Sequence, residues 1–120
     1  MSNDLLKKKC VPCEGGVKPL NPAEIGGFMN QVSGWTLSES EKPNLQKFDL
    51  GAKISKEYKF KDFIGAINFV NNIAEIAESE GHHPDIAIHY NKVMLTLDTH
   101  AIGGLSENDF ILAAKIDAMK

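Results

Sequence analysis

The spacing of hydrophobic residues along the chain predicts three helices. The clearest runs from Phe63 to Ser79, where apolar residues recur at the 3.6-residue period of an amphipathic helix and Gly81 supplies a stop signal. A shorter stripe of the same kind fills residues 22–32, and a third helix is predicted from residue 107 to the C-terminus. Each helix is preceded by a side chain that can cap it, in chain order Asn21, Asp62 and Ser106.

Alternating apolar and polar residues predict four strands between these helices. Two lie within residues 35–60, on either side of the breaker 41–44. The other two lie within residues 86–97, and Asn91-Lys92 between them suits a two-residue hairpin turn. The order α-β-β-α-β-β-α predicts an α+β domain, a four-stranded antiparallel sheet with three helices on one face.

Length and composition describe one globular domain. The 120 residues are 42% hydrophobic and 24% charged, the balance of a chain with one core. We assign residues 21–120 to this domain and the polar residues 1–20 to an irregular N-terminal arm. The net charge of −3 argues against direct nucleic-acid binding. The sequence contains neither an apolar run of membrane-spanning length nor the apolar core of a signal peptide, so we expect no membrane partner and a cytoplasmic protein, or a nuclear one in a eukaryote.

The arm contains both cysteines of the chain, Cys10 and Cys13. One Cys-x-x-Cys pair supplies only half of a zinc site, and a thioredoxin-type pair should follow a strand and open a helix. We therefore expect a surface arm, far from the histidines, whose thiols catalysis does not require. The adjacent Lys7, Lys8 and Lys9 are expected to lower a thiol pKa. Metal or redox chemistry at the pair is the alternative.

The four histidines all lie between the second and third predicted helices, at His82, His83, His89 and His100. If Tyr90 pairs with Val93, the same register places His83 opposite His100 at one end of the hairpin. Glu78, four residues before His82, can point toward the same place. Histidine has an unperturbed pKa near ~6.5, so this cluster suits proton transfer or metal binding. His89 lies further down the strand, and we read it as an ordinary surface or core residue.

Metal binding is the main rival to proton transfer at this cluster. Two histidines and a carboxylate can form a metal site, but adjacent histidines diverge along a strand and no His-Glu-x-x-His spacing is present. Nor does the sequence contain a nucleophile elbow or a glycine-rich phosphate loop. The pattern favours metal-free acid–base chemistry on a small neutral or weakly charged molecule, without identifying that molecule.

From about Leu20 to the C-terminus, the chain resembles the pterin-4a-carbinolamine dehydratases, a family also known as the dimerisation cofactor of a homeodomain transcription factor. The resemblance rests on an ordered set of segments: Gly34-Trp35, Lys59-Phe60-Lys61-Asp62-Phe63, Glu78-x-x-x-His82-His83-Pro84, Tyr90-Asn91-Lys92-Val93, Thr99-His100, Gly103-Gly104-Leu105-Ser106 and Asp109.

The resemblance implies dehydration of 4a-hydroxytetrahydropterin to quinonoid dihydropterin, a step in tetrahydrobiopterin recycling, with no metal or organic cofactor. It implies that His82 and His100 are acid–base residues, that His83 orients the substrate and that Glu78 supports His82. The other substrate-binding positions are Trp35, Pro84, Asp98, Thr99 and Asp109. Asp98 departs from the family pattern, in which a small hydroxyl residue is expected.

The resemblance also implies a homodimer or a homotetramer. Animal members of the family bind a transcription factor, so the alternative function is a non-catalytic protein-interaction module on the same fold. The intact set of His82, His83 and His100 favours catalysis, because a pure adaptor has no need of three imidazoles at one strand end.

Overall fold

The computed structural model describes residues 4–10, 20–38, 52–99 and 102–119. These residues form helices and strands in the predicted order, preceded by one short additional helix. The helices are α1 (Asp4–Lys7), α2 (Pro22–Met29), α3 (Phe63–Glu80) and α4 (Glu107–Met119). The strands are β1 (Thr36–Ser38), β2 (Lys53–Lys59), β3 (Asp85–His89) and β4 (Lys92–Leu97).

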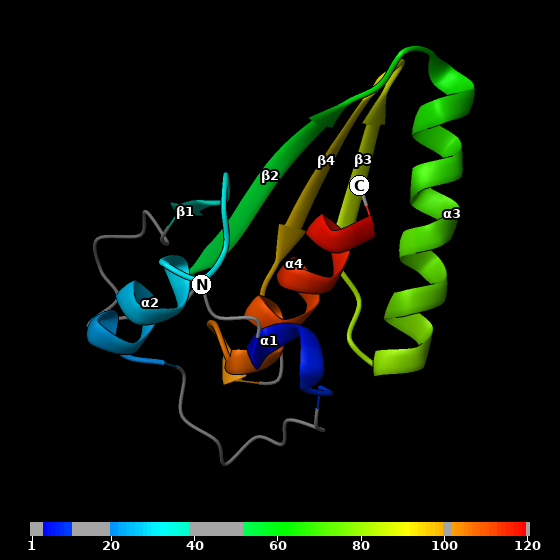
Figure 1. Cartoon of the computed structure of the whole chain (residues 1–120). Coiled ribbons are helices and arrows are strands. Elements are labelled where there is room, and N and C mark those ends of the chain that lie inside the picture. Colours follow the sequence, from blue (N-terminus) through cyan, green and yellow to red (C-terminus); the bar gives the residue numbers. More distant parts are fainter. Residues whose placement is uncertain (1–3, 11–19, 39–51, 100–101, 120) are drawn as a thin grey trace.

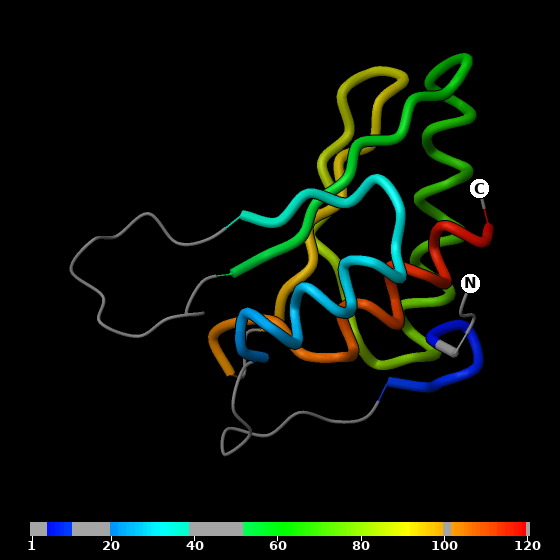
Figure 2. The backbone as a smooth tube through the Cα atoms, turned by 60° about the vertical axis from the view of Figure 1, so that its left-hand side comes forward, coloured from blue at the N-terminus to red at the C-terminus, as the bar shows by residue number. Residues whose placement is uncertain are grey.

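The strands form one antiparallel sheet in the order β1-β2-β4-β3 (Figure 1). Alternate side chains of the two central strands are buried, which gives the sheet one apolar face: Ile54, Tyr58, Val93, Leu95 and Leu97. The helices α3 and α4 lie on the same side of the sheet (Figure 2). The predicted α+β class is confirmed, and the core lies between this face and the helices.

The helix ends follow the predicted capping signals. Asn21 and Glu24 form a reciprocal capping box at the start of α2, with N–H to oxygen distances of 2.8 and 2.9 Å. Asp62 accepts the Gly65 N–H at 2.8 Å at the start of α3. Gly81 ends α3 in the left-handed conformation, with φ 69°. These caps fix where α3 stops, which sets the position of the histidines that follow.

The β3–β4 hairpin differs from the predicted register by two residues. His89 pairs with Lys92 and Ile88 with Val93, so the turn is Tyr90-Asn91. Tyr90 takes the turn's left-handed conformation, with φ 54°. Asn91 is bound to the end of β2, since its side-chain amide donates to the Phe60 carbonyl at 2.9 Å and its own carbonyl accepts the Phe60 N–H at 2.8 Å. A shift of two residues preserves the side-chain faces, so the apolar face survives the error.

The expectation of an irregular arm is wrong for residues 4–7. They form α1, which packs against α4. Leu5 is 3% exposed and belongs to the core cluster, so burial of one apolar side chain holds this turn in place. The assignment of residues 1–20 to an arm outside the domain stays a prediction.

One charged residue lies among the fully buried side chains. Asp109 is 0% exposed in the first turns of α4, together with Phe110 and Leu112. None of the helices in the described ranges is both long and apolar enough to cross a membrane. Because a charged group is costly to bury without partners, Asp109 marks a candidate functional site.

Candidate active site

The buried carboxylate of Asp109 stands at the centre of the candidate site. One of its oxygens, Oδ1, lies 2.6 Å from His82 Nε2. The other, Oδ2, accepts hydrogen bonds from the Thr99 hydroxyl at 2.8 Å and from the Ser106 N–H at 2.9 Å. Asp109 thus accepts hydrogen bonds from three donors, and the His82 Nε2–H donates to Oδ1.

The start of α4 explains how a carboxylate comes to lie there. Asp109 is the third residue of the helix, and its side chain reaches back to the Ser106 N–H as in a capping box. The second bond of a capping box, from the Asp109 N–H to the Ser106 hydroxyl, is not formed, because the Asp109 N–H donates to the Ser106 carbonyl at 3.1 Å. The Ser106 hydroxyl is instead 2.8 Å from the Thr99 hydroxyl. The cap of the helix and the site are therefore one hydrogen-bond network.

His82 enters this network directly after the end of α3. Its N–H donates to the Ala77 carbonyl at 3.2 Å, and its side chain is 11% exposed. Asp109 fixes the ring orientation and the tautomer, as the aspartate of a catalytic triad does for its histidine. Nδ1 has no hydrogen-bond partner within the described part of the chain. It is therefore the ring nitrogen that can exchange a proton with a ligand.

His83 points to a different partner. Its Nε2 lies 2.8 Å from Glu78 Oε2, and both side chains are exposed, at 59% and 79%. This differs from the expectation that Glu78 supports His82. The left-handed Gly81 turns the chain so that His82 faces α4 while His83 returns beside the last turn of α3.

Thr99 is held by backbone hydrogen bonds to Gly103 and Gly104. Its N–H donates to the Gly104 carbonyl at 2.8 Å, and Gly103, with φ 71°, donates to the Thr99 carbonyl at 3.1 Å. Pro84 precedes β3 and Asp98 follows β4, so both lie at the same end of the hairpin as His82. His100 follows Thr99 in the sequence but lies outside the described residues, so its placement stays a prediction.

Trp35 belongs to a second polar group, around Asp117. The Trp35 indole N–H donates to Asp117 Oδ2 at 3.0 Å, and Lys56 Nζ and the Tyr58 hydroxyl bind Oδ1. Burial and the bond to Asp117 raise the pKa of Tyr58. Asp117 lies near the C-terminal end of α4, whereas Asp109 is in its first turn. The one hydrogen-bond donor of the indole is thus engaged at Asp117 rather than at the histidine group.

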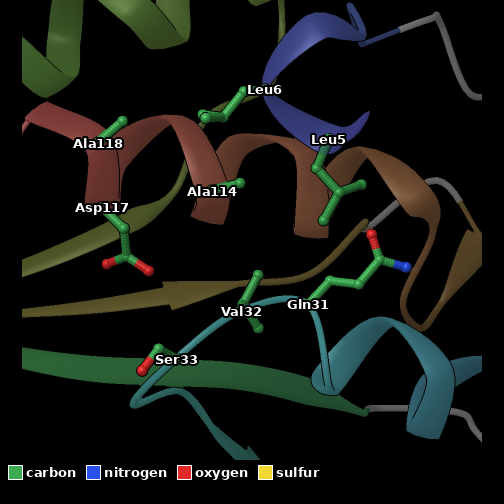
Figure 3. A pocket seen from close by; sticks show the side chains of 8 residues that line it. All are labelled: Leu5, Leu6, Gln31, Val32, Ser33, Ala114, Asp117 and Ala118. Atoms are coloured by element: carbon green, nitrogen blue, oxygen red, sulfur yellow. The ribbon is translucent and has the colours of Figure 1, made fainter. Parts of the chain in front are cut away.

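A pocket of about 270 Å³ adjoins this second group, between α1, the segment after α2 and α4 (Figure 3). Its walls are mostly apolar, and Asp117 is its one charged lining residue. Because Asp117 already binds three donors, it keeps α4 on the sheet rather than offering an open carboxylate. The sequence-predicted site residues do not line this pocket.

Cys10 lies nearer to the histidine network than expected. Its Sγ is 3.6 Å from the carbonyl oxygen of Asn108, the residue before Asp109, and its N–H donates to Glu80 Oε1 at 2.8 Å. Burial and the nearby Glu80 carboxylate raise the pKa of the thiol from 9.0 to about 12. The predicted lowering by lysines is therefore wrong, because the thiol faces carboxylates and the interior. Cys13 lies outside the described residues.

The sequence does not indicate Ser106 as a member of the network around Asp109. The Ser106 cap signal was visible, but nothing in the sequence showed that its hydroxyl meets Thr99. In the part of the chain that the structure covers, no three His, Cys, Asp or Glu side chains gather as a metal site. The absence of a metal in catalysis stays a prediction.

Comparison with known proteins identifies relatives along nearly the whole chain. Residues 18–119 match the family model described as pterin 4 alpha carbinolamine dehydratase. A protein of Nitrosospira multiformis is 47% identical over 117 residues, covering 98% of this chain and 93% of its own. One of Halorhodospira halophila is 43% identical, covering 96% of each chain. Both carry the provisional name pterin-4-alpha-carbinolamine dehydratase.

Two solved structures share the fold. The transcriptional coactivator/pterin dehydratase from Brucella melitensis is 30% identical with a TM-score of 0.70, covering 85% of this chain and 98% of its own. A pterin dehydratase-like protein, described as a RuBisCO assembly factor in the alpha-carboxysome, is 22% identical with a TM-score of 0.55, covering 71% of this chain and 87% of its own. The second likeness concerns the fold alone.

Proposed function

We propose that this chain, which belongs to the pterin 4 alpha carbinolamine dehydratase family, dehydrates 4a-hydroxytetrahydropterin to quinonoid dihydropterin in tetrahydrobiopterin recycling. The observation that carries the proposal is the buried hydrogen-bond network of His82, Asp109 and Thr99. A histidine held by a buried carboxylate is an arrangement for proton transfer, and it lies on segments by which the chain resembles the family.

The reaction needs two proton transfers. The bond between C4a and the hydroxyl oxygen breaks, and that oxygen takes up a proton to leave as water. The ring N–H beside C4a loses a proton, and its electron pair forms the new C=N bond. We assign the two transfers to His82, through Nδ1, and to His100. Each histidine can contribute ~10²-fold or more to the rate.

The exposed pair of His83 and Glu78 suits substrate orientation rather than proton transfer. Glu78 accepts a hydrogen bond from Nε2 of His83. The other ring nitrogen of His83 can then form a hydrogen bond with a polar edge of the pterin. We assign Pro84, Asp98 and Thr99 to the walls around the substrate because they lie at the same hairpin end. The contribution of Trp35 to the substrate-binding site stays a separate proposal, since its indole N–H is bound to Asp117.

The test is the dehydration rate of 4a-hydroxytetrahydropterin with purified protein, compared with the spontaneous rate in the same buffer. We expect a large acceleration that survives exhaustive treatment with a chelator. A rate equal to the spontaneous one would refute the proposed enzyme, and a loss on chelation that zinc restores would refute the metal-free mechanism.

An interaction module is the second candidate. Three large apolar side chains are exposed on the β3–β4 turn and in the first turn of α3: Phe63 at 47%, Ile64 at 63% and Tyr90 at 66% exposure. Exposed apolar side chains that form one patch mark protein contacts. A folded protein with no acceleration of dehydration, but with a stable partner in a pull-down, would favour this candidate.

A further inference from the structure

We infer that Glu80 is a positioning residue for His82 and that it acts by tying the N-terminal arm and α4 to the turn that carries this histidine. The inference rests on the proposed function, in which His82 transfers a proton. It extends that function to a residue and a segment outside the histidine cluster.

Glu80 occupies an unfavourable place for a carboxylate. It is the last residue of α3, where the negative end of the helix dipole repels an anion, and its side chain is only 5% exposed. A charge kept in such a place needs compensating partners. Gly81 and then His82 follow it directly, so a displacement of Glu80 is transmitted to the histidine through a single residue.

The compensating partners come from two other parts of the chain. Oε1 accepts the Cys10 N–H at 2.8 Å. Oε2 lies 3.3 Å from Lys115 Nζ on α4 and 3.8 Å from Lys9 Nζ in the arm. Burial pushes the pKa of the Glu80 carboxyl upward, but the Cys10 bond and the two lysines outweigh it and hold the pKa below its ordinary value. The carboxylate therefore stays charged and joins three segments.

The N-terminal arm also contacts the start of α4, beside Asp109, which binds His82. Cys10 Sγ contacts the Asn108 carbonyl, and Lys8 binds Glu107 in the first turn of α4. Asp109, which directly follows Asn108, holds the His82 imidazole. His82 is thus fixed at two points, through its backbone by the α3 end that Glu80 anchors and through its ring by α4. Loss of the Glu80 anchor frees the backbone of His82. A displacement of a catalytic side chain by ~1 Å can lower the rate ~10²-fold.

The test compares Glu80→Ala and Glu80→Gln with Glu75→Gln, a matched control because Glu75 is an exposed carboxylate on the same helix. The measurements are kcat and KM for dehydration, thermal stability, and the NMR signal of the His82 Nε2–H proton. The glutamine variant retains an oxygen for the Cys10 N–H. It keeps the test valid if the alanine variant does not fold.

We expect kcat to fall about 10- to 100-fold in Glu80→Ala and less in Glu80→Gln, with KM changed less than about twofold. The His82 signal should shift or broaden in both variants and stay unchanged in Glu75→Gln. An unchanged His82 signal in folded Glu80 variants would overturn the inference, whatever the effect on stability or rate. If the wild-type protein proves inactive, the proposed function fails, and the His82 signal alone still decides whether Glu80 positions this residue.

Discussion

At the residue scale, the site depends on Asp109, because its two oxygens bind three donors from residues that are themselves mostly buried. In Asp109→Asn, an NH₂ group replaces one oxygen and meets a donor instead of an acceptor. We expect kcat to fall by ~10²-fold or more and the free energy of unfolding to fall by ~1–3 kcal/mol. Urea unfolding and steady-state kinetics measure both, with the exposed Glu57→Gln as control. Full activity in Asp109→Asn would show that this carboxylate does not support the histidine.

The Cys10 thiol should be unreactive while the protein is folded. Its pKa is raised from 9.0 to about 12, so very little thiolate exists at pH 8. In a Cys13→Ser background, we expect a thiol reagent to react on the order of a thousandfold more slowly with native than with urea-unfolded protein. Equal rates would contradict the buried placement of Cys10.

The same shift predicts a pH dependence of stability. The folded state holds the thiol proton more tightly than the unfolded state. The contribution of Cys10 to the free energy of unfolding is therefore complete below pH 9 and is lost as the pH rises from 9 toward about 12. Stability should therefore decline more steeply in this range for the Cys13→Ser protein than for the double variant Cys10→Ser, Cys13→Ser. Parallel curves would mean that Cys10 titrates normally.

Single residues could be predicted from the sequence where local signals report them. Asp109 is expected as a site residue from the family resemblance, and the structure shows its carboxylate bound to both His82 and the Ser106 N–H. A contact between Asp109 and the substrate stays a prediction. The partner of Glu78 could not be predicted, because the left-handed turn at Gly81 decides which histidine faces which way. The raised pKa of Cys10 results from its burial and from Glu80, which lies 70 residues away in the sequence, so the neighbouring lysines do not indicate it.

At the element scale, the end of α3 determines where the histidines lie. Gly81 adopts φ 69°, and a Cβ added there meets nothing within 4 Å. Gly81→Ala should therefore cost only the backbone strain of the left-handed conformation, ~1–2 kcal/mol, measured by chemical unfolding. A negligible cost would contradict the assigned C-cap conformation. Gly26→Ala, inside α2 and also unobstructed, is the control and should be neutral or stabilising.

Elements with strong local signals were predicted well, and those set by distant contacts were not. The caps and the apolar periodicity predict where α2, α3 and α4 begin, and the structure confirms these three starts. The hairpin turn was misplaced because Tyr90, a residue that rarely takes positive φ, forms it with support from Phe60. The helix α1 has only four residues, and its burial against α4 has no local sequence signal.

At the scale of the whole molecule, the sheet has two edges that no strand of the described residues pairs. In the order β1-β2-β4-β3, the outer strands are β1 and β3, and β3 leaves Ile86 37% exposed. Exposed edges and apolar side chains favour pairing with another copy. We predict a homodimer or homotetramer, measured by light scattering at micromolar concentration. A particle with the mass of one 13.2 kDa chain would contradict this prediction.

The central claim is that histidines at one end of the hairpin transfer the protons of the dehydration. The most direct measurement is kcat for 4a-hydroxytetrahydropterin in His82→Ala and His100→Ala, each compared with His89→Ala, whose histidine is exposed at the far end of β3. Thermal unfolding is recorded for every variant.

The account predicts a loss of about 10²-fold or more in His82→Ala and His100→Ala, with both proteins still folded, and unchanged kcat in His89→Ala. Wild-type kcat in a folded His82→Ala protein would contradict the account.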